Sequence, residues 1–564
     1  MERKETEART SVVRNHFLGY LLGVFLRYSS YSAILNLQSS INIEDGLGTI
    51  SLSTSYISCN IFLVFFTTIL LRKFGAKKCL IASEVTYIIY ILANLYPEFY
   101  TLIPAAILVG AGEATIWSSM TLINFYFATK YATLKKHKNK ENDYFVNLYS
   151  GYFFTCIQFC QIFGNLIVYA VLYAFVDSES NDTQNTENFT TTQSYSDSDK
   201  MMFCGSNDCQ DSTAVDESLN QYIPTNNVSL IILISILTFM CFTSMICHWY
   251  FISEDVTVVV ISEVIDKAKS ETSENYVNLA FEVQADEILN DSSQRKKDDV
   301  DIGDNKKCTS VTKSNSNSSF KSINKEEIFS EVFYDKIHSS ENLNPARYEA
   351  DETFGGGYLK SLKELGKHTV KTTQLLLIPI TLYLGLLEAF VFSELTRAFS
   401  SCVVGVEMVG IHMATYGFSD AVLSYVVGKV GKKIGRIPFF VFSMVVDFGS
   451  YAYCLWWDPN LESAWSIFII YFAFGVTDGI WQTLTNVLYL EYFEGSHDVA
   501  VTSWVLWSTL GYALQFGWST KLCVNVKIYI QVGTLIVGMI CYGVAEYLHR
   551  NEKLTEVAEE ETRL

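Results

Sequence analysis

The sequence is short of charge and of recognisable catalytic motifs. Only 18% of its 564 residues are charged, whereas an ordinary soluble protein has about 25%. It contains no Walker lysine loop, no His/Cys set at metal-ligand spacing and no nucleophile elbow. Its net charge of −19 argues against a nucleic acid partner, which basic patches would have to bind. The sequence therefore predicts a protein that is not an enzyme and needs no metal or cofactor.

Apolar residues are plentiful and gathered into blocks. They make up 49% of the chain, and runs such as LIILISILTFMCF at residues 230–242 recur within blocks of roughly 20 residues, the length that crosses a bilayer as a helix. The strict alternation of a membrane β-barrel is absent, and a spanning helix satisfies its own backbone hydrogen bonds. We therefore predict an all-α polytopic membrane protein with about twelve spans. The expected spans lie near 15–37, 49–71, 79–96, 101–127, 145–176, 228–250, 372–394, 403–427, 437–457, 464–490, 500–523 and 527–548.

Basic residues predict the orientation. Short cytoplasmic loops are enriched in Lys and Arg, and the two most basic short loops are RKFGAKK at Arg72–Lys78 and KVGKKIGR at Lys429–Arg436. Placing these loops inside puts both termini in the cytoplasm. The expected outside segments then hold only four basic residues, which are Lys200, Arg397, Lys521 and Lys527.

Two long loops separate groups of spans. The outside loop 177–226 carries glycosylation sequons at Asn181 and Asn188, and Asn227 lies close to the next span. An oxidising environment there favours a disulfide at Cys204, with Cys209, Cys402 or Cys523 as its partner. The inside loop 251–371 is polar, and its composition predicts disorder.

An internal repeat relates the two parts of the chain. Arg72-Lys73-Phe74-Gly75 matches Lys432-Lys433-Ile434-Gly435 at an offset of 360 residues, and Asn60 matches Asp420 at the same offset. Trp117 matches Trp481 at a similar one. Two six-helix halves in the same orientation, joined by a long loop, are the major-facilitator arrangement. The predicted organisation is a first half at 1–250, a loop at 251–371, a second half at 372–549 and a cytoplasmic tail at 550–564.

Several strings resemble one family within that superfamily, the uncoordinated-93 (Unc-93) family. They are NLQSSIN at Asn36–Asn42, FCGSNDC at Phe203–Cys209, LLIPITLYLGLLEAF at Leu376–Phe390, DGIWQTLTNVLY at Asp478–Tyr489 and LCVNVKIYI at Leu522–Ile530. The resemblance implies a regulatory subunit of a potassium channel at the plasma membrane. The fold alone would favour a secondary transporter coupled to protons or cations. A trafficking partner of membrane receptors, in an endosomal or lysosomal membrane, is a third possibility that the resemblance implies.

Departures from the family pattern favour the regulatory interpretation. Where the family carries an Arg-Leu-Trp-Glu run, this chain has Val505-Leu506-Trp507-Ser508. The usual acidic residue of the superfamily's basic loop is also missing from both copies of the repeat.

Charged residues inside spans are candidate site residues, because each costs roughly 2.5–3.5 kcal/mol to insert. In the major-facilitator arrangement, Arg27 and Glu113 border the central cavity, as do Glu388, Asp420, Asp478 and Trp481. We expect Arg27 to pair with Glu113 or Glu388, either in a proton, cation or substrate site or as a structural ion pair. Glu84, Glu407 and Asp447 are expected to be peripheral or near a membrane interface.

The chain ends in Thr562-Arg563-Leu564. A hydroxyl followed by an apolar terminal residue and a free carboxylate is the pattern that PDZ domains bind by strand addition. A PDZ-domain scaffold is therefore a candidate partner, beside the lipid bilayer and the potassium channel.

Overall fold

The computed structural model describes residues 2–135, 140–180, 203–209, 227–253, 363, 365–493 and 497–563. Most of the predicted loop 251–371, the sequons at Asn181 and Asn188, and Leu564 lie outside these residues. The described part is helical and contains no strand. The N-half is formed by α1 (Glu2–Ile41), η1 (Glu44–Gly46), α2 (Leu47–Phe65), α3 (Thr67–Phe74), α4 (Ala76–Ala93), α5 (Phe99–Leu134), α6 (Lys140–Ser180), η3 (Gly205–Asn207) and α9 (Asn227–Phe251). The C-half is formed by α14 (Thr372–Phe390), η8 (Val391–Ser401), α15 (Cys402–Val404), η9 (Val406–Met408), α16 (Val409–Ile434), α17 (Arg436–Trp456), α18 (Ser466–Tyr492), α19 (His497–Gly517) and α20 (Val524–Arg563).

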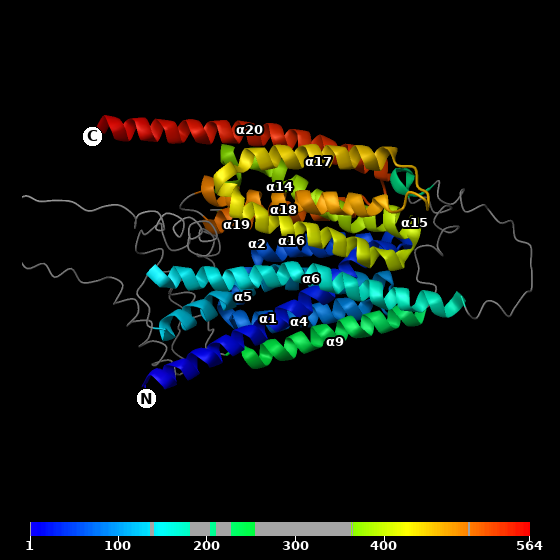
Figure 1. Ribbon diagram of the computed structural model, residues 1–564, viewed down its shortest axis with the longest axis horizontal. Helices are drawn as coiled ribbons and strands as arrows, with labels where there is room; N and C mark the ends of the chain where they lie inside the picture. Colours follow the sequence, from blue (N-terminus) through cyan, green and yellow to red (C-terminus); the bar gives the residue numbers. More distant parts are fainter. Residues whose placement is uncertain are drawn as a thin grey trace, which may run out of the picture.

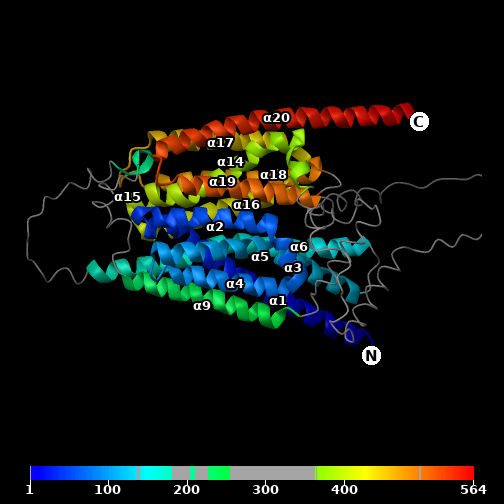
Figure 2. The same ribbon diagram turned by 180° about the vertical axis from the view of Figure 1, so that it is seen from behind.

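The long helices run side by side along the long axis of the molecule, with the N-half on one side and the C-half on the other (Figure 1). Both chain ends lie at the same end of this bundle, which the view from behind also shows (Figure 2). The short elements η3 and α15 lie at the opposite end, which we call the disulfide end for the two bonds described below.

Eight helices in the described part of the chain are long and apolar enough to cross a membrane. They include α2, α5, α6, α9, α17, α18 and α20, and a continuous stretch from Thr372 to Val404. The other four expected spans coincide with α1, α4, α16 and α19. These helices contain more polar side chains, and in α1 the interior positions Arg27, Asn36 and Gln38 are buried inside the protein.

The seventh span is longer than the sequence predicted. We expected it to end near residue 394, with Arg397 in an outside loop, but the helix continues through η8, which has π-helical turns, into α15. Arg397 is only 1% exposed, and Lys527, also expected outside, is fully buried near the start of α20. The expected end of this span was wrong because a charged residue can continue a helix when carboxylates neutralise it in the folded chain, as happens to Arg397 and also to Lys527.

The two copies of the repeat share a backbone feature. α3 ends at Gly75 with a φ of 82°, and α16 ends at Gly435 with a φ of 81°. This conformation is open to glycine and costly for other residues. Glycine therefore terminates the helix before the next span in both halves.

The halves touch mainly through three helix pairs, in which α2 packs on α19, α6 on α16, and α1 on η8. Tyr56 of α2 stacks on Tyr512 of α19 with the ring centroids 4.5 Å apart. Near the disulfide end, the hydroxyl of Ser39 lies 2.9 Å from that of Thr396, and the hydroxyl of Ser401 donates to that of Ser40 at 2.7 Å. Hydroxyl pairs and packed rings thus join the halves.

Candidate functional site

Three buried acids of the C-half lie in one region. Glu388 is on α14, Asp420 on α16 and Asp478 on α18, and they are 6%, 6% and 2% exposed. Helices α16 and α18 approach closely at Gly475 of α18, where a Cβ atom would lie 2.1 Å from the hydroxyl of Ser419 on α16. The absence of a side chain at this position therefore allows Asp420 and Asp478 to come near one another.

Polar side chains partly solvate these carboxylates. The Gln482 amide donates to Glu388 at 2.7 Å and lies 3.5 Å from Asp478 Oδ2, so it bridges the two acids. The Tyr416 hydroxyl donates to Asp478 at 2.7 Å, and Ser424 donates to Asp420 at 3.1 Å. Among the described residues no base forms an ion pair with any of the three. Because carboxylates in a buried cluster repel one another when ionised, the cluster is suited to hold a proton or a monovalent cation.

Trp481 lies in a different part of the C-half. It is fully buried, its indole nitrogen donates to Asp447 at 2.8 Å, and its ring stacks on Phe440. The Tyr383 hydroxyl donates to the same carboxylate at 2.7 Å. We expected Asp447 to be peripheral or near a membrane interface. It is instead a fully buried acceptor between α14, α17 and α18. Sequence could not show this, because the two donors are on other helices.

Arg27 is fully buried in the N-half but forms no ion pair with Glu113 or Glu388. None of its three guanidinium nitrogens has a hydrogen-bond partner within the described chain. The guanidinium carbon instead lies 3.4 Å from the centre of the Tyr28 ring and 4.6 Å from that of Tyr87. Glu113 accepts a hydrogen bond from Trp117, one turn further along α5, at 2.9 Å. Cation–π contacts replace the direct pairing that the sequence predicted.

Glu84 is also not peripheral. It is fully buried on α4, and its carboxylate lies 2.6 Å from the ring of His248 on α9. The Ser244 hydroxyl donates to the same carboxylate oxygen at 2.6 Å. Of the three acids expected to be peripheral or near a membrane interface, only Glu407, on η9, is partly exposed.

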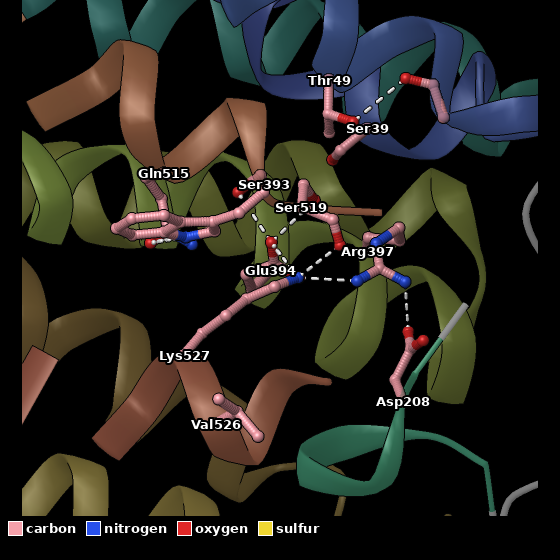
Figure 3. A network of polar contacts seen from close by, with 12 residues as sticks. Ser39, Thr49, Asp208, Ser393, Glu394, Arg397, Gln515, Ser519, Val526 and Lys527 are labelled. Carbon is pink, nitrogen blue, oxygen red and sulfur yellow. Dashed lines mark hydrogen bonds and ion pairs between the residues drawn. The ribbon is translucent and has the colours of Figure 1, made fainter. Parts of the chain in front are cut away.

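Sequence analysis missed a deeply buried ionic network, which lies near the disulfide end. Figure 3 shows four charged side chains pointing toward one another from η8, α20 and the segment after η3. Glu394 is contacted by Arg397 at 2.6 Å and by Lys527 at 2.8 Å. Arg397 also pairs with Asp208, and Ser519 donates to Glu394 at 2.8 Å. Two carboxylates and two cations are therefore buried as a balanced set.

Two disulfides hold the segment that supplies Asp208. Of the partners left open for Cys204, the structure has Cys402, and Cys209 is bonded to Cys523. The backbone N–H of Val524 donates to the carbonyl of Asp208 at 2.9 Å. A segment between α6 and α9 of the N-half is thus fixed to the C-half. The position of Asp208 between two cysteines was the one sequence signal that could have indicated this role.

Comparison with known proteins identifies the relationship. No family model matches the chain. It is 27% identical over 544 residues to Protein unc-93 homolog A of Xenopus laevis, covering 96% of this chain and 95% of that protein. It is 24% identical to the "Putative potassium channel regulatory protein unc-93" of Caenorhabditis elegans, covering 95% of this chain and 61% of that protein.

The solved structures give the fold. The crystal structure of a mutant of the nucleoside transporter NupG matches with a TM-score of 0.52 and 10% identity, over 94% of this chain and all of that one. This likeness shows the major-facilitator arrangement that the repeat predicted. Over nearly its whole length, and on this fold, the chain is similar to proteins named unc-93 at 24–27% identity, as the family strings in its sequence predicted.

Proposed function

We propose that this chain is a non-enzymatic regulatory subunit of a potassium channel at the plasma membrane. The observation that carries the proposal is the similarity, over 95% of the chain, to a relative named as a potassium channel regulatory protein. A regulatory subunit acts by binding one channel state more tightly than another, and a few kcal/mol of difference shifts the open probability greatly. Such a role needs a contact surface and no transport cycle.

The lipid-facing side of α20 is the contact surface that we propose. Small residues let membrane helices approach one another closely, and the last two spans contain Gly511, Gly533 and Gly538. A Cβ at Gly511 would lie 2.5 Å from the carbonyl of Leu382, and one at Gly538 would lie 3.1 Å from Ile380. These two glycines are therefore used for packing within the C-half.

Gly533 remains available. It is exposed, and an added Cβ would meet nothing within 4 Å. Exposed Tyr529, Val537 and Ile540 share its side of the helix at spacings of three or four residues. An apolar stripe with a glycine at its centre fits a transmembrane helix of a channel.

Co-expression tests the proposal. We expect this protein to change the current per channel of a two-pore-domain potassium channel at fixed surface density of the channel. Gly533→Trp should abolish the change. Gly449→Trp is the matched control, because Gly449 of α17 is also exposed with open space around it. An unchanged current with the wild-type protein at the cell surface would reject the regulatory proposal.

The acid cluster favours a second candidate, a proton- or cation-coupled transporter. Glu388, Asp420 and Asp478 are buried, and no base within the described part of the chain forms an ion pair with them, an arrangement that suits a proton or ion pathway. Purified protein in liposomes would then show saturable uptake driven by an ion gradient, which Asp478→Asn abolishes and Asp458→Asn, an exposed control, does not. Uptake of this kind, independent of any channel, would replace the regulatory proposal.

A further inference from the structure

The buried pair of His248 and Glu84 has an unusual set of contacts. Both side chains are fully buried, and Nδ1 of the imidazole lies 2.6 Å from Oε1 of the carboxylate. The other ring nitrogen, Nε2, lies 3.1 Å from the backbone carbonyl oxygen of Tyr20 on α1. Each nitrogen of the ring therefore faces an oxygen of another helix.

These contacts determine how many protons the pair of His248 and Glu84 holds. A carbonyl oxygen can only accept, so Nε2 must carry a hydrogen. A neutral imidazole has one hydrogen, which leaves Nδ1 bare against a carboxylate oxygen. A contact of 2.6 Å between two acceptors is repulsive unless a proton lies between them. That proton is on Nδ1, giving an imidazolium and a carboxylate, or on Oε1, giving an imidazole and a carboxylic acid.

We propose that His248 and Glu84 form a proton-binding site in the N-half, which holds one exchangeable proton. This inference goes beyond the proposed function, because it requires neither a channel partner nor a transported solute. Its ligand is the proton alone.

One further donor faces the pair. The Ser244 hydroxyl lies 2.6 Å from Oε1 of Glu84, whereas Oε2 has no hydrogen-bond partner among the described residues. The other ionisable groups that interact with Glu84 are Arg27 and Tyr20 of α1 and Cys241 and Cys247 of α9. Glu113 of α5 interacts with Arg27.

The proton also joins three helices. The His248 ring links α9 to α4 through Glu84 and to α1 through Tyr20, and the Ser244 hydroxyl lies 2.8 Å from the carbonyl of Gly23 on α1. Gly23 makes room for the ring, since a Cβ there would lie 2.5 Å from Nε2. α1 continues to Ser39, whose hydroxyl meets that of Thr396 in the C-half. Loss of the proton would therefore loosen the helix that connects this site to the contact between the halves.

Spectroscopy of the purified full-length chain tests the proton count. With ¹⁵N-labelled histidine, the His248 signal, assigned by its loss in His248→Gln, should show hydrogen on both ring nitrogens. Alternatively, infrared difference spectra should show a carboxylic acid band that is lost in Glu84→Gln. Buried His412 is the matched control. Its one side-chain hydrogen bond is to the Ser400 hydroxyl at 2.7 Å, which can donate, so its ring should be neutral. A neutral His248 beside an ionised Glu84 would overturn the proposal.

Discussion

Replacing Arg397 with methionine should strongly destabilise the C-half. Arg397 is 1% exposed and neutralises both Asp208 and Glu394. In Arg397→Met, Lys527 still pairs with Glu394 at 2.8 Å, but Asp208, which is 5% exposed, loses its cation. Breaking a buried ion pair by removing one partner costs about 3–5 kcal/mol. We expect a loss of that size in the free energy of unfolding, measured by denaturing-detergent titration in mixed micelles, together with a lower melting temperature.

A second substitution tests the reasoning. Adding Asp208→Asn to Arg397→Met removes the charge that lost its ion pair with Arg397 and leaves Glu394 paired with Lys527, so the double variant should recover most of the loss. Arg550→Met is the control, because this pair with Glu546 has a 62% exposed arginine. An exposed pair contributes at most about 1 kcal/mol. A double variant no more stable than Arg397→Met, or an Arg397→Met protein as stable as the wild type, would refute the charge-balance argument.

Three further outcomes are expected. Arg27→Met should lower the free energy of unfolding much less than Arg397→Met does. Inserting the unpaired Arg27 charge costs roughly 2.5–3.5 kcal/mol, and its desolvated cation–π contact returns only about 2 kcal/mol. Poor expression of Arg27→Met alone would contradict this. Peptide mapping without reduction should recover both disulfides, and Cys402→Ala should lower stability by up to about 5 kcal/mol, since its bond closes a loop of 198 residues; recovery of a Cys204–Cys209 peptide would contradict the pairing. Glycosidase treatment should shift the wild type but not a variant lacking Asn181 and Asn188. Asn317 is a sequon in the predicted inside loop 251–371, so modification there would contradict the predicted topology.

Much of the architecture followed from the pattern of residues. Blocks of roughly 20 apolar residues predict spans because the bilayer fixes the length of a helix that crosses it. The repeat of Arg72–Gly75 at Lys432–Gly435 predicted the two-half arrangement, and glycine ends the helix in both copies. The family strings also lie along nearly all of the membrane-embedded chain. The apolar blocks and the helix-ending glycines are local features of the sequence, and inside a bilayer an apolar block of this length forms a helix.

The sites were predicted much less well, because they depend on contacts between distant helices. The sequence showed that Arg27, Glu388, Asp420 and Asp478 are charged residues inside spans, where each is costly to insert. It could not show which of these side chains are in contact. Arg27 was expected to face a carboxylate and instead lies against two tyrosine rings. The sequence is compatible with either a carboxylate or tyrosine rings beside Arg27, so only the packing of the helices decides between them.

The sequence by itself determined the helical membrane fold, the relation between its halves and the resemblance to the Unc-93 family. The tertiary structure decided how its buried charges are neutralised. Residue 208 meets residue 397 across 189 positions, and residue 84 meets residue 248 across 164. Hydrophobic periodicity depends on neighbours within a few turns, whereas the energy of a buried charge depends on a partner that can come from any helix. For this reason Arg397 and Lys527, which look like loop residues in the sequence, lie in the ionic core of the C-half.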